Sequence, residues 1–391
     1  MATTNIPVAA RVINQPTLSS PLNKRFYTEF SQTFNQDTTP AIPLTTGYIV
    51  KNYILRYSFT LQTTGGTPLA PVNINQSDIL GVGGPEIFPA VNVLINGTTP
   101  LRSLSGRALA MLEFFTTKQP PWQSWTITPG GAGNNYNGTA VVEGELIIPW
   151  AMADLMSPLD TSLDTRLMTA NSLSIKLNIG DATNITGQAA VIVNGSASGI
   201  AVELLNDAFF GAANGFRPTF TALISQYSVP NTTGGAQSRA KLQLPSAEPK
   251  LNYKAFMVNT QNVFGTQDVD AVSTFAIKSC NTYLFDNIPP GIWTRYRNTL
   301  RGDWPLGFIG PQGQVNPYAL QVNGGLVPPA TNPAPGTGMV NLDGWYYMDF
   351  SPDGYITSAL NTEKIAALFL EAQTNQAAIM TVYPIEIWAQ V

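Results

Sequence analysis

The stretch Tyr53-Ile-Leu-Arg-Tyr-Ser-Phe-Thr-Leu61 decides the fold class of this 391-residue chain. Its odd positions carry apolar or aromatic side chains, whereas the even positions carry Arg56, Ser58 and Thr60, with Ile54 as the one apolar exception. In a β-strand, successive side chains point to opposite faces of the sheet. The alternation therefore predicts a half-buried strand that has one face on a core and the other in water.

The same alternation returns in Ser172–Ile179, where every second residue, from Leu173 to Ile179, is predicted to point inward. Turn residues such as Asn96-Gly97 and Pro352-Asp-Gly354 separate further apolar stretches. The other predicted strands are Val91–Ile95, Gly144–Ile148, Phe220–Val229, Lys241–Leu244, Ser273–Phe285, Gly344–Phe350, Ala366–Glu371 and Ala378–Trp388. Many short strands with frequent turns indicate an all-β sandwich or barrel.

Helical periodicity is sparse in this sequence. Apolar side chains recur at helical spacing in Leu101–Lys118, which we predict to be a helix. Ala151–Leu167 is a weaker helical candidate that Pro158 interrupts. Asn361–Ala372 is open to two interpretations, because its Ala and Glu content favours a helix while the apolar run Ile365–Leu370 also suits a buried strand.

The length of the chain favours two domains, since 391 residues exceed one ordinary core. The polar stretch Ser228–Ala236, which contains Pro and Gly, marks the boundary between them. The predicted division is an N-terminal arm at 1–25, a first β-domain at 26–229 and a second β-domain at 230–391. Long loop insertions are predicted at Trp122–Tyr136 and Gly302–Gly338, and loops of this length are usually functional.

The composition argues against catalysis. The chain has no histidine and a single cysteine, Cys280, so it cannot form a His-containing catalytic unit, a His-containing zinc site or an internal disulfide. Only 11% of the residues are charged, and the net charge of −4 argues against a surface that coats nucleic acid. We predict that the protein is not an enzyme and holds no cofactor or transition metal. Calcium is the least improbable exception, because oxygen ligands suffice for it.

Four short patterns resemble parts of chemical sites. Gly81-Val-Gly-Gly84 resembles a phosphate-binding turn, but no Lys-Ser/Thr follows it, so a plain turn is favoured. Paired carboxylates serve glycosidases and metal sites. The pairs in this chain are Glu143/Glu145, predicted to share one face of a strand, Asp160/Asp164, at i, i+4 on the possible helix, and Asp268/Asp270 in a polar loop. With no third ligand or acid near any pair in sequence, we interpret all three as solvated surface groups.

Two clusters combine arginine with aromatic residues. Trp293–Trp304 carries Arg295, Arg297 and Arg301, which could stack on bases or sugars, although the net charge favours ion pairs or interface contacts. Lys24-Arg25 precedes Phe26 and Tyr27 at the predicted start of the fold. Cys280 is predicted to lie within a strand and to be chemically inert.

Taken in order, several segments resemble the double jelly-roll major capsid proteins of tailless icosahedral viruses of the PRD1 type. The segments that carry the resemblance are Thr46–Leu55, Glu145–Trp150, Ser172–Ile179, Gly344–Asp349 and Asn375–Ile385. The resemblance implies two eight-stranded jelly-roll barrels in tandem, with long loop insertions and a few short helices. It also implies trimers of pseudo-hexagonal outline that tile a shell, with loops forming towers and the amino-terminal segment beneath.

The resulting hypothesis is a viral major capsid protein located in the virion. Its expected partners are two further copies in a homotrimer, neighbouring trimers, other capsid proteins such as a penton, and an internal lipid membrane, with no specific nucleic acid. Neither a signal peptide nor a membrane span is visible, so synthesis in the host cytoplasm is expected. The alternatives are a carbohydrate-binding β-sandwich, such as a phage receptor-binding protein, and a vertex or spike protein; the scattered tryptophans do not favour carbohydrate binding.

The first 25 residues form the predicted arm. Pro7, Pro16 and Pro21 interrupt them, and their apolar runs are too short to make a core. We predict that the arm is disordered in isolated trimers and becomes ordered on assembly. Its basic and aromatic end suits a membrane interface or the underside of a shell.

Overall fold

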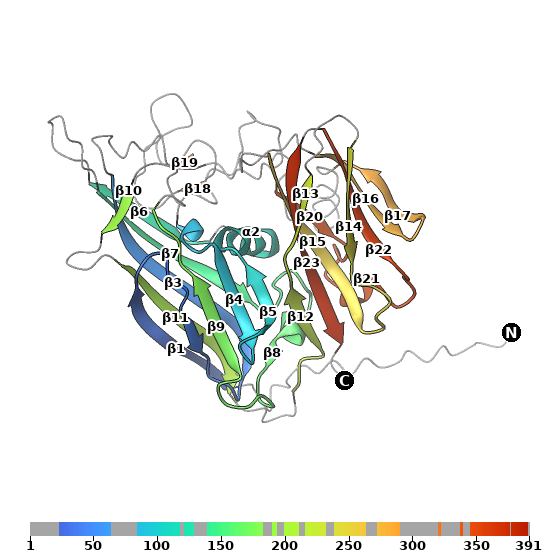
Figure 1. Cartoon of the computed structure of the whole chain (residues 1–391). Coiled ribbons are helices and arrows are strands. Elements are labelled where there is room, and N and C mark those ends of the chain that lie inside the picture. The colour runs from blue at the N-terminus through green and yellow to red at the C-terminus, as the bar shows by residue number, and fades with distance from the viewer. Residues whose placement is uncertain are drawn as a thin grey trace.

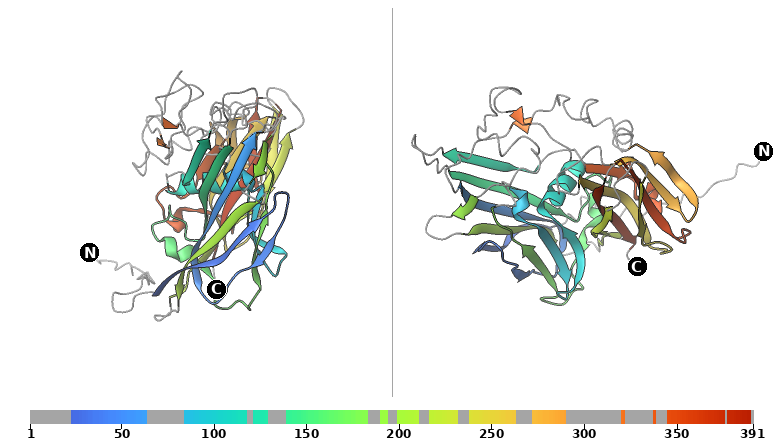
Figure 2. Two further views of the ribbon diagram at one scale, coloured as in Figure 1. Left: turned by 90° about the vertical axis from the view of Figure 1, so that its left-hand side faces the viewer. Right: turned by 45° about the horizontal axis from the view of Figure 1, so that its top comes forward.

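The computed structural model describes residues 23–63, 84–117, 121–128, 139–182, 190–193, 199–210, 216–231, 238–262, 272–289, 320–321, 337–338, 345–375 and 377–389. Figure 1 shows two β-barrels side by side, the first coloured blue to green and the second yellow to red. The strands of the two barrels run in the same general direction (Figure 2). The predicted all-β class is confirmed in this part of the chain.

The first barrel consists of two facing sheets. One sheet has the order β1 (Asn23–Phe34), β11 (Ile200–Phe210), β3 (Ile49–Thr63), β7 (Thr139–Pro149) and β6 (Gln123–Thr128), and β8 (Leu163–Asp164) and β10 (Ala190–Val193) also pair with β3. The other side has the order β2 (Ala41–Pro43), β9 (Leu173–Asn178), β4 (Ala90–Ile95) and β5 (Thr99–Leu104). Helix α2 (Gly106–Thr117) packs against β7 and the 3₁₀ turn η1 (Pro85–Ile87).

Alternation along β3 and β9 is confirmed. The odd positions from Tyr53 to Leu61 are buried, whereas Arg56 is exposed and Ser58 is half-buried. On β9, Leu173, Ile175 and Leu177 are buried as expected, and so is Ile179 directly after the strand. These side chains fill the space between the two sheets of the first barrel.

The second barrel also has two sides. Around β23 (Ala378–Ala389) lie β12 (Phe220–Ile224), β13 (Tyr227–Asn231), β15 (Leu251–Asn262), β20 (Trp345–Asp349) and β21 (Leu360–Asn361). The facing sheet has the order β14 (Ser238–Leu244), β22 (Leu368–Thr374), β16 (Val272–Ser279) and β17 (Thr282–Ile288). The remaining short elements are the pair β18 (Leu320–Gln321) and β19 (Thr337–Gly338), and the 3₁₀ turns η2 (Pro158–Thr161) and η3 (Ile356–Ser358).

The two barrels share one sheet. A parallel bridge between Arg102 on β5 and Ile224 on β12 joins their strands into a ten-stranded sheet. Every residue of β20 is buried, because one face of the sheet around it packs on the second core and the other face packs on the first. Strands buried on both faces are apolar without alternation. Figure 2 shows α2 between the two barrels.

Several predicted boundaries are wrong. The helix predicted at Leu101–Lys118 begins at Gly106, because residues 99–104 form β5. Ala151–Leu167 contains no α-helix; it folds into turns, η2 and the two-residue β8, which pairs with β3. The ambiguous stretch Asn361–Ala372 resolves as strand at its end, where β22 begins at Leu368.

Two predicted long strands are each divided. Ser273–Phe285 is a hairpin of β16 and β17, and the chain turns at Cys280, which has a positive φ of 53°. Phe220–Val229 is divided into β12 and β13. Both of these strands pair with β23.

Candidate functional site: the junction between the two barrels

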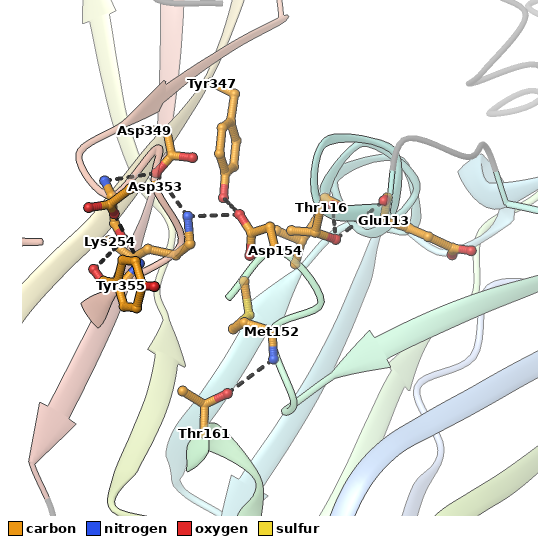
Figure 3. Close-up of polar contacts among 12 residues, drawn as sticks. Glu113, Thr116, Met152, Asp154, Thr161, Lys254, Tyr347, Asp349, Asp353 and Tyr355 are labelled. Carbon is orange, nitrogen blue, oxygen red and sulfur yellow. Dashed lines mark hydrogen bonds and ion pairs between the residues drawn. The ribbon is translucent and has the colours of Figure 1, made fainter. Parts of the chain in front are cut away.

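A buried lysine lies where the two barrels meet. Lys254 is on β15 and Asp349 ends β20, both in the second barrel, whereas Asp154 follows β7 of the first barrel (Figure 3). The ammonium Nζ of Lys254 is 2.7 Å from Asp154 Oδ2 and 2.8 Å from Asp349 Oδ1. All three side chains are 0–1% exposed. Buried charges are tolerated only when they are paired and hydrogen-bonded, and here the lysine is paired with both barrels.

Neighbouring groups hold the two carboxylates in place. The Tyr347 hydroxyl donates to Asp154 Oδ2 at 3.1 Å, and its ring centroid lies 5.6 Å from Lys254 Nζ. The backbone N–H of Ser351 donates to Asp349 Oδ1 at 3.0 Å. The Tyr347 ring also stacks on Phe115 of α2 at 5.1 Å. The cluster is therefore part of a packed core to which both barrels contribute.

The 150–161 segment carries Asp154 into the junction. Thr161 is fully buried, and its hydroxyl donates to the carbonyl of Trp150 at 2.8 Å and accepts the N–H of Met152 at 3.0 Å. The N–H of Met156 donates across the junction to the carbonyl of Gly354 at 3.0 Å. The Thr161 hydroxyl thus closes the segment on itself (Figure 3), and the backbone bond from Met156 attaches the segment to the second barrel.

Arg102 forms a second buried connection. Its guanidinium donates to the carbonyl of Ala222 on β12 and to the carbonyl of Pro149 at the end of β7, both at 2.7 Å. It also lies 4.4 Å from the ring centroid of Trp150, a distance typical of a cation–π contact. Burial lowers the pKa of Arg102 to about 9. A charged side chain is stable here because fixed carbonyl dipoles and an aromatic face replace water.

Two glutamates lie beside α2. Glu86 forms an ion pair with Arg107 at 2.8 Å, and Glu113 accepts the backbone N–H of Ile147 at 3.2 Å. Burial raises the pKa of Glu113 to about 7, the Ile147 N–H opposes this rise, and the nearby Glu145 carboxylate adds to it. Helix α2 therefore carries, on its contact with β7, a carboxyl group whose pKa lies close to neutral pH.

Two of the three predicted carboxylate pairs lie within the described residues. Glu143 and Glu145 share the outward face of β7, as expected, and Arg56 on β3 is 2.9 Å from Glu145. Asp160 is in η2, not on a helix with Asp164, which lies in β8 and pairs with Arg166 at 2.6 Å. The expected helical i, i+4 relation of this pair is therefore wrong.

The other sequence candidates have different outcomes. Arg25 lies over the rings of Tyr27 and Tyr48, at 4.2 and 4.9 Å from their centroids. Cys280 is exposed in a turn, so its predicted position within a strand is wrong. Gly84 immediately precedes η1. The candidates that lie outside the described residues are Gly81 to Gly83, Asp268, Asp270, Arg295, Arg297 and Arg301.

Metal ligands and membrane spans can be assessed in the part of the chain that the structure describes. Within it, no three Asp, Glu, Cys or His side chains gather as metal ligands would. None of its helices is long and apolar enough to cross a bilayer.

The junction residues were not predicted from the sequence. Lys254 interrupts the apolar stretch Leu251–Val258, and a lone cation inside an apolar strand could have signalled a buried charge. Asp154 and Arg102 carry no such signal, because each lies in a region predicted to be helical.

No protein-family model matches the chain, and no curated protein matches its sequence. Solved structures do match. The major capsid protein P2 of bacteriophage PM2 has a TM-score of 0.55 at 12% identity, over 94% of this chain and 98% of that chain. A chain of Sulfolobus Turreted Icosahedral Virus has a TM-score of 0.57 at 13% identity, over 94% of this chain and 91% of that chain.

The PBCV-1 virus capsid gives a third match, with a TM-score of 0.53 at 10% identity, over 94% of this chain and 95% of that chain. These similarities extend over both barrels and establish the fold at identities too low to establish more. The predicted double jelly-roll fold is therefore confirmed.

Proposed function

We propose that this protein is the major capsid protein of an icosahedral virus, located in the virion. The observation that carries the proposal is the structural match over 94% of the chain to the PM2 capsid protein and the PBCV-1 capsid. The chain forms homotrimers of pseudo-hexagonal outline, and these trimers tile the shell. Its role is structural and not enzymatic.

The junction supports this role on physical grounds. Domains in one chain usually move relative to each other unless their interface is large and apolar. Here the barrels share a sheet, a core and buried charges. A tile must present its edges at fixed angles, and a rigid pair of barrels meets that requirement.

Light scattering and negative-stain microscopy of the purified protein test the proposal. We expect three times the mass of one chain at micromolar concentration, and hexagonal plates in the images. A trimeric ring uses the same heterologous contact three times. A monomer at micromolar concentration would contradict the proposal, and a compact trimer that binds a glycan array would favour the carbohydrate-binding alternative.

The arm provides a test of assembly that leaves the barrels intact. Residues 1–22 lie outside the described residues, and β1 begins at Asn23. We propose that the arm contacts neighbouring subunits or an internal lipid membrane. Deleting residues 1–22 should leave the melting temperature of the trimer nearly unchanged and impair shell formation, whereas normal shells from the truncated protein would exclude the role.

We further propose that the second barrel begins with β12. The bonds of β12 and β13 to β23 favour this over a division at 229/230, which falls within β13. Limited proteolysis tests the boundary: cleavage should concentrate between Phe210 and Phe220, and cleavage only after β13 would support the later division.

We also propose that other capsid proteins, such as a penton, bind the assembled shell.

A further inference from the structure

The contact of Lys254 with two buried carboxyl groups has the components of an amide-forming site. We propose that Lys254 condenses with Asp349 to form an intramolecular isopeptide bond, with Asp154 acting as the acid–base group. The proposal concerns this chain alone and does not depend on a capsid role.

The nucleophile and the electrophile face each other on adjacent strands. β15 pairs with β20, and the residue after Lys254, Ala255, is the register partner of Asp349. Lys254 Nζ is 2.8 Å from Asp349 Oδ1, so it lies next to the carboxyl carbon that it would attack. Fixed positioning of two reacting groups removes much of the entropic cost of their reaction.

Burial limits the net charge that the site can carry. The site holds one ammonium and two carboxyl groups at 0–1% exposure, and it is neutral only when one carboxyl group carries a proton. The absence of bulk water also protects the product amide from hydrolysis.

The two aspartates have different roles because their surroundings differ. Asp349 Oδ1 accepts the Ser351 N–H at 3.0 Å, and this donor can stabilise the negative charge that develops when the carboxyl carbon is attacked. Asp154 Oδ2 is 2.7 Å from Lys254 Nζ and is held by the Tyr347 hydroxyl at 3.1 Å. Asp154 is therefore placed to move protons, and Asp349 to be attacked.

The reaction balances without an oxidant or a co-reactant. Asp154, as carboxylate, takes a proton from the Lys254 ammonium. The free amine attacks Cγ of the protonated Asp349, forming a C–N bond. Asp154 then gives its proton to the departing hydroxyl, which leaves as water, and takes a second proton from the new nitrogen. The products are a neutral amide, one water molecule and a protonated Asp154.

The chain contains a matched control. Lys278 Nζ is 2.7 Å from Glu371 Oε2, a similar distance, but these side chains are 15% and 9% exposed. A second lysine, Lys241, lies 3.8 Å from the same carboxylate. This site therefore has two cations and one carboxyl group, whereas the Lys254 site has one cation and two carboxyl groups. We expect no amide between Lys278 and Glu371.

Mass spectrometry of the full-length protein, unfolded after purification, tests the proposal. The intact mass should be lower than the sequence mass by one water molecule. Trypsin should release Leu251–Lys278, uncut at Lys254, joined to Gly302–Lys364. Full sequence mass with linear peptides would overturn the proposal, and a link from Lys254 to Gln119–Arg166 would overturn the assignment of Asp349.

Two further measurements distinguish the amide from a loss of water elsewhere in the chain. Succinimide formation at Asp343-Gly344 or Asp353-Gly354 also removes one water but leaves linear peptides, and finding it alone would count against the amide. The variant Asp154→Asn should fold, as checked by circular dichroism and oligomer mass, and should retain the full mass. A folded Asp154→Asn protein that loses water as completely as wild type would overturn the acid–base role.

Discussion

Two clusters in this protein each place one cation between two carboxyl groups, but one cluster is exposed and the other is buried. On the outer face of the first barrel, Arg56 contacts Glu145 at 2.9 Å and Glu203 at 3.1 Å, and its side chain is 48% exposed. Register alone explains this contact, because Glu145 and Glu203 are the partners of Arg56 on the two neighbouring strands. Solvent screens such pairs, so each contributes little to stability.

At the junction, Lys254 also lies between two carboxylates at similar distances, but its side chain is fully buried. Its partners belong to different barrels, and desolvation makes the loss of any member costly. The comparison teaches that surroundings, and not distance, decide what an ion pair does. The exposed cluster lies on the outer face of a sheet and adds little stability, whereas the buried cluster specifies how two barrels fit together.

The largest expected effect comes from Lys254→Met. The substitution removes the cation from between two buried carboxyl groups, together with the amide that we propose, so the free energy of unfolding should fall by about 3–5 kcal/mol or more. Urea unfolding monitored by tryptophan fluorescence measures it. The control is Lys254→Met combined with Asp154→Asn and Asp349→Asn, which should recover part of the loss. A loss below about 1 kcal/mol in the single variant would mean that the buried cluster contributes no more to stability than an exposed ion pair does.

Arg102→Met extends the comparison to the second buried connection between the barrels. The carbonyls of Pro149 and Ala222 would lose their donor, and each buried acceptor left without a partner costs about 1–3 kcal/mol. We expect a loss of about 2–4 kcal/mol in the same urea experiment. An unchanged midpoint would mean that these carbonyls find other donors and that Arg102 does not join the barrels.

Glu113 should make the stability of the protein depend on pH. Its folded pKa of about 7 lies above the ordinary value of 4.5, so the folded state binds the extra proton. Its contribution to stability is therefore fully present below about pH 4.5 and is lost as the pH rises through about 7. Between about pH 5 and pH 8 we expect a fall of about 1–3 kcal/mol.

Glu113→Gln, which cannot ionise, provides the control for this pH dependence. Its stability should vary less over the same pH range, as measured by urea unfolding at each pH. Equal slopes for the variant and wild type would assign the pH dependence to other groups.

The smallest effect is expected for Arg56→Gln. An exposed ion pair contributes at most about 1 kcal/mol, and salt weakens it further. Thermal unfolding at low and high salt should show a small difference that shrinks as salt is added. A loss comparable to that of Lys254→Met would break the distinction between the two clusters.

The strands that sequence reasoning found are those with one buried face. β3 and β9 alternate, and their alternation alone predicts them. β11 was not predicted, because the buried Asn206 interrupts its inward-facing positions. β1 was not predicted either, because most of its side chains are exposed or half-buried at the edge of the sheet.

The candidate site was beyond sequence reasoning for a different reason. Lys254 and Asp349 are 95 residues apart, and Tyr347 and Asp154 are 193 residues apart. No local pattern reports a contact over such separations. Gly106 illustrates the same limit, since a Cβ there would lie 1.9 Å from the Pro85 carbonyl oxygen, and helical periodicity does not reveal that contact.

Composition and local periodicity are enough to predict the all-β class and the lack of histidine chemistry. The tandem barrels were predicted from the length of the chain and from the resemblance to a known family. Which charged groups are buried, and which strands have no alternation, depends on tertiary contacts. Burial depends on contacts between segments far apart in the chain. β20 lies between two cores and Lys254 lies between two barrels, so both acquire their roles only when the barrels meet.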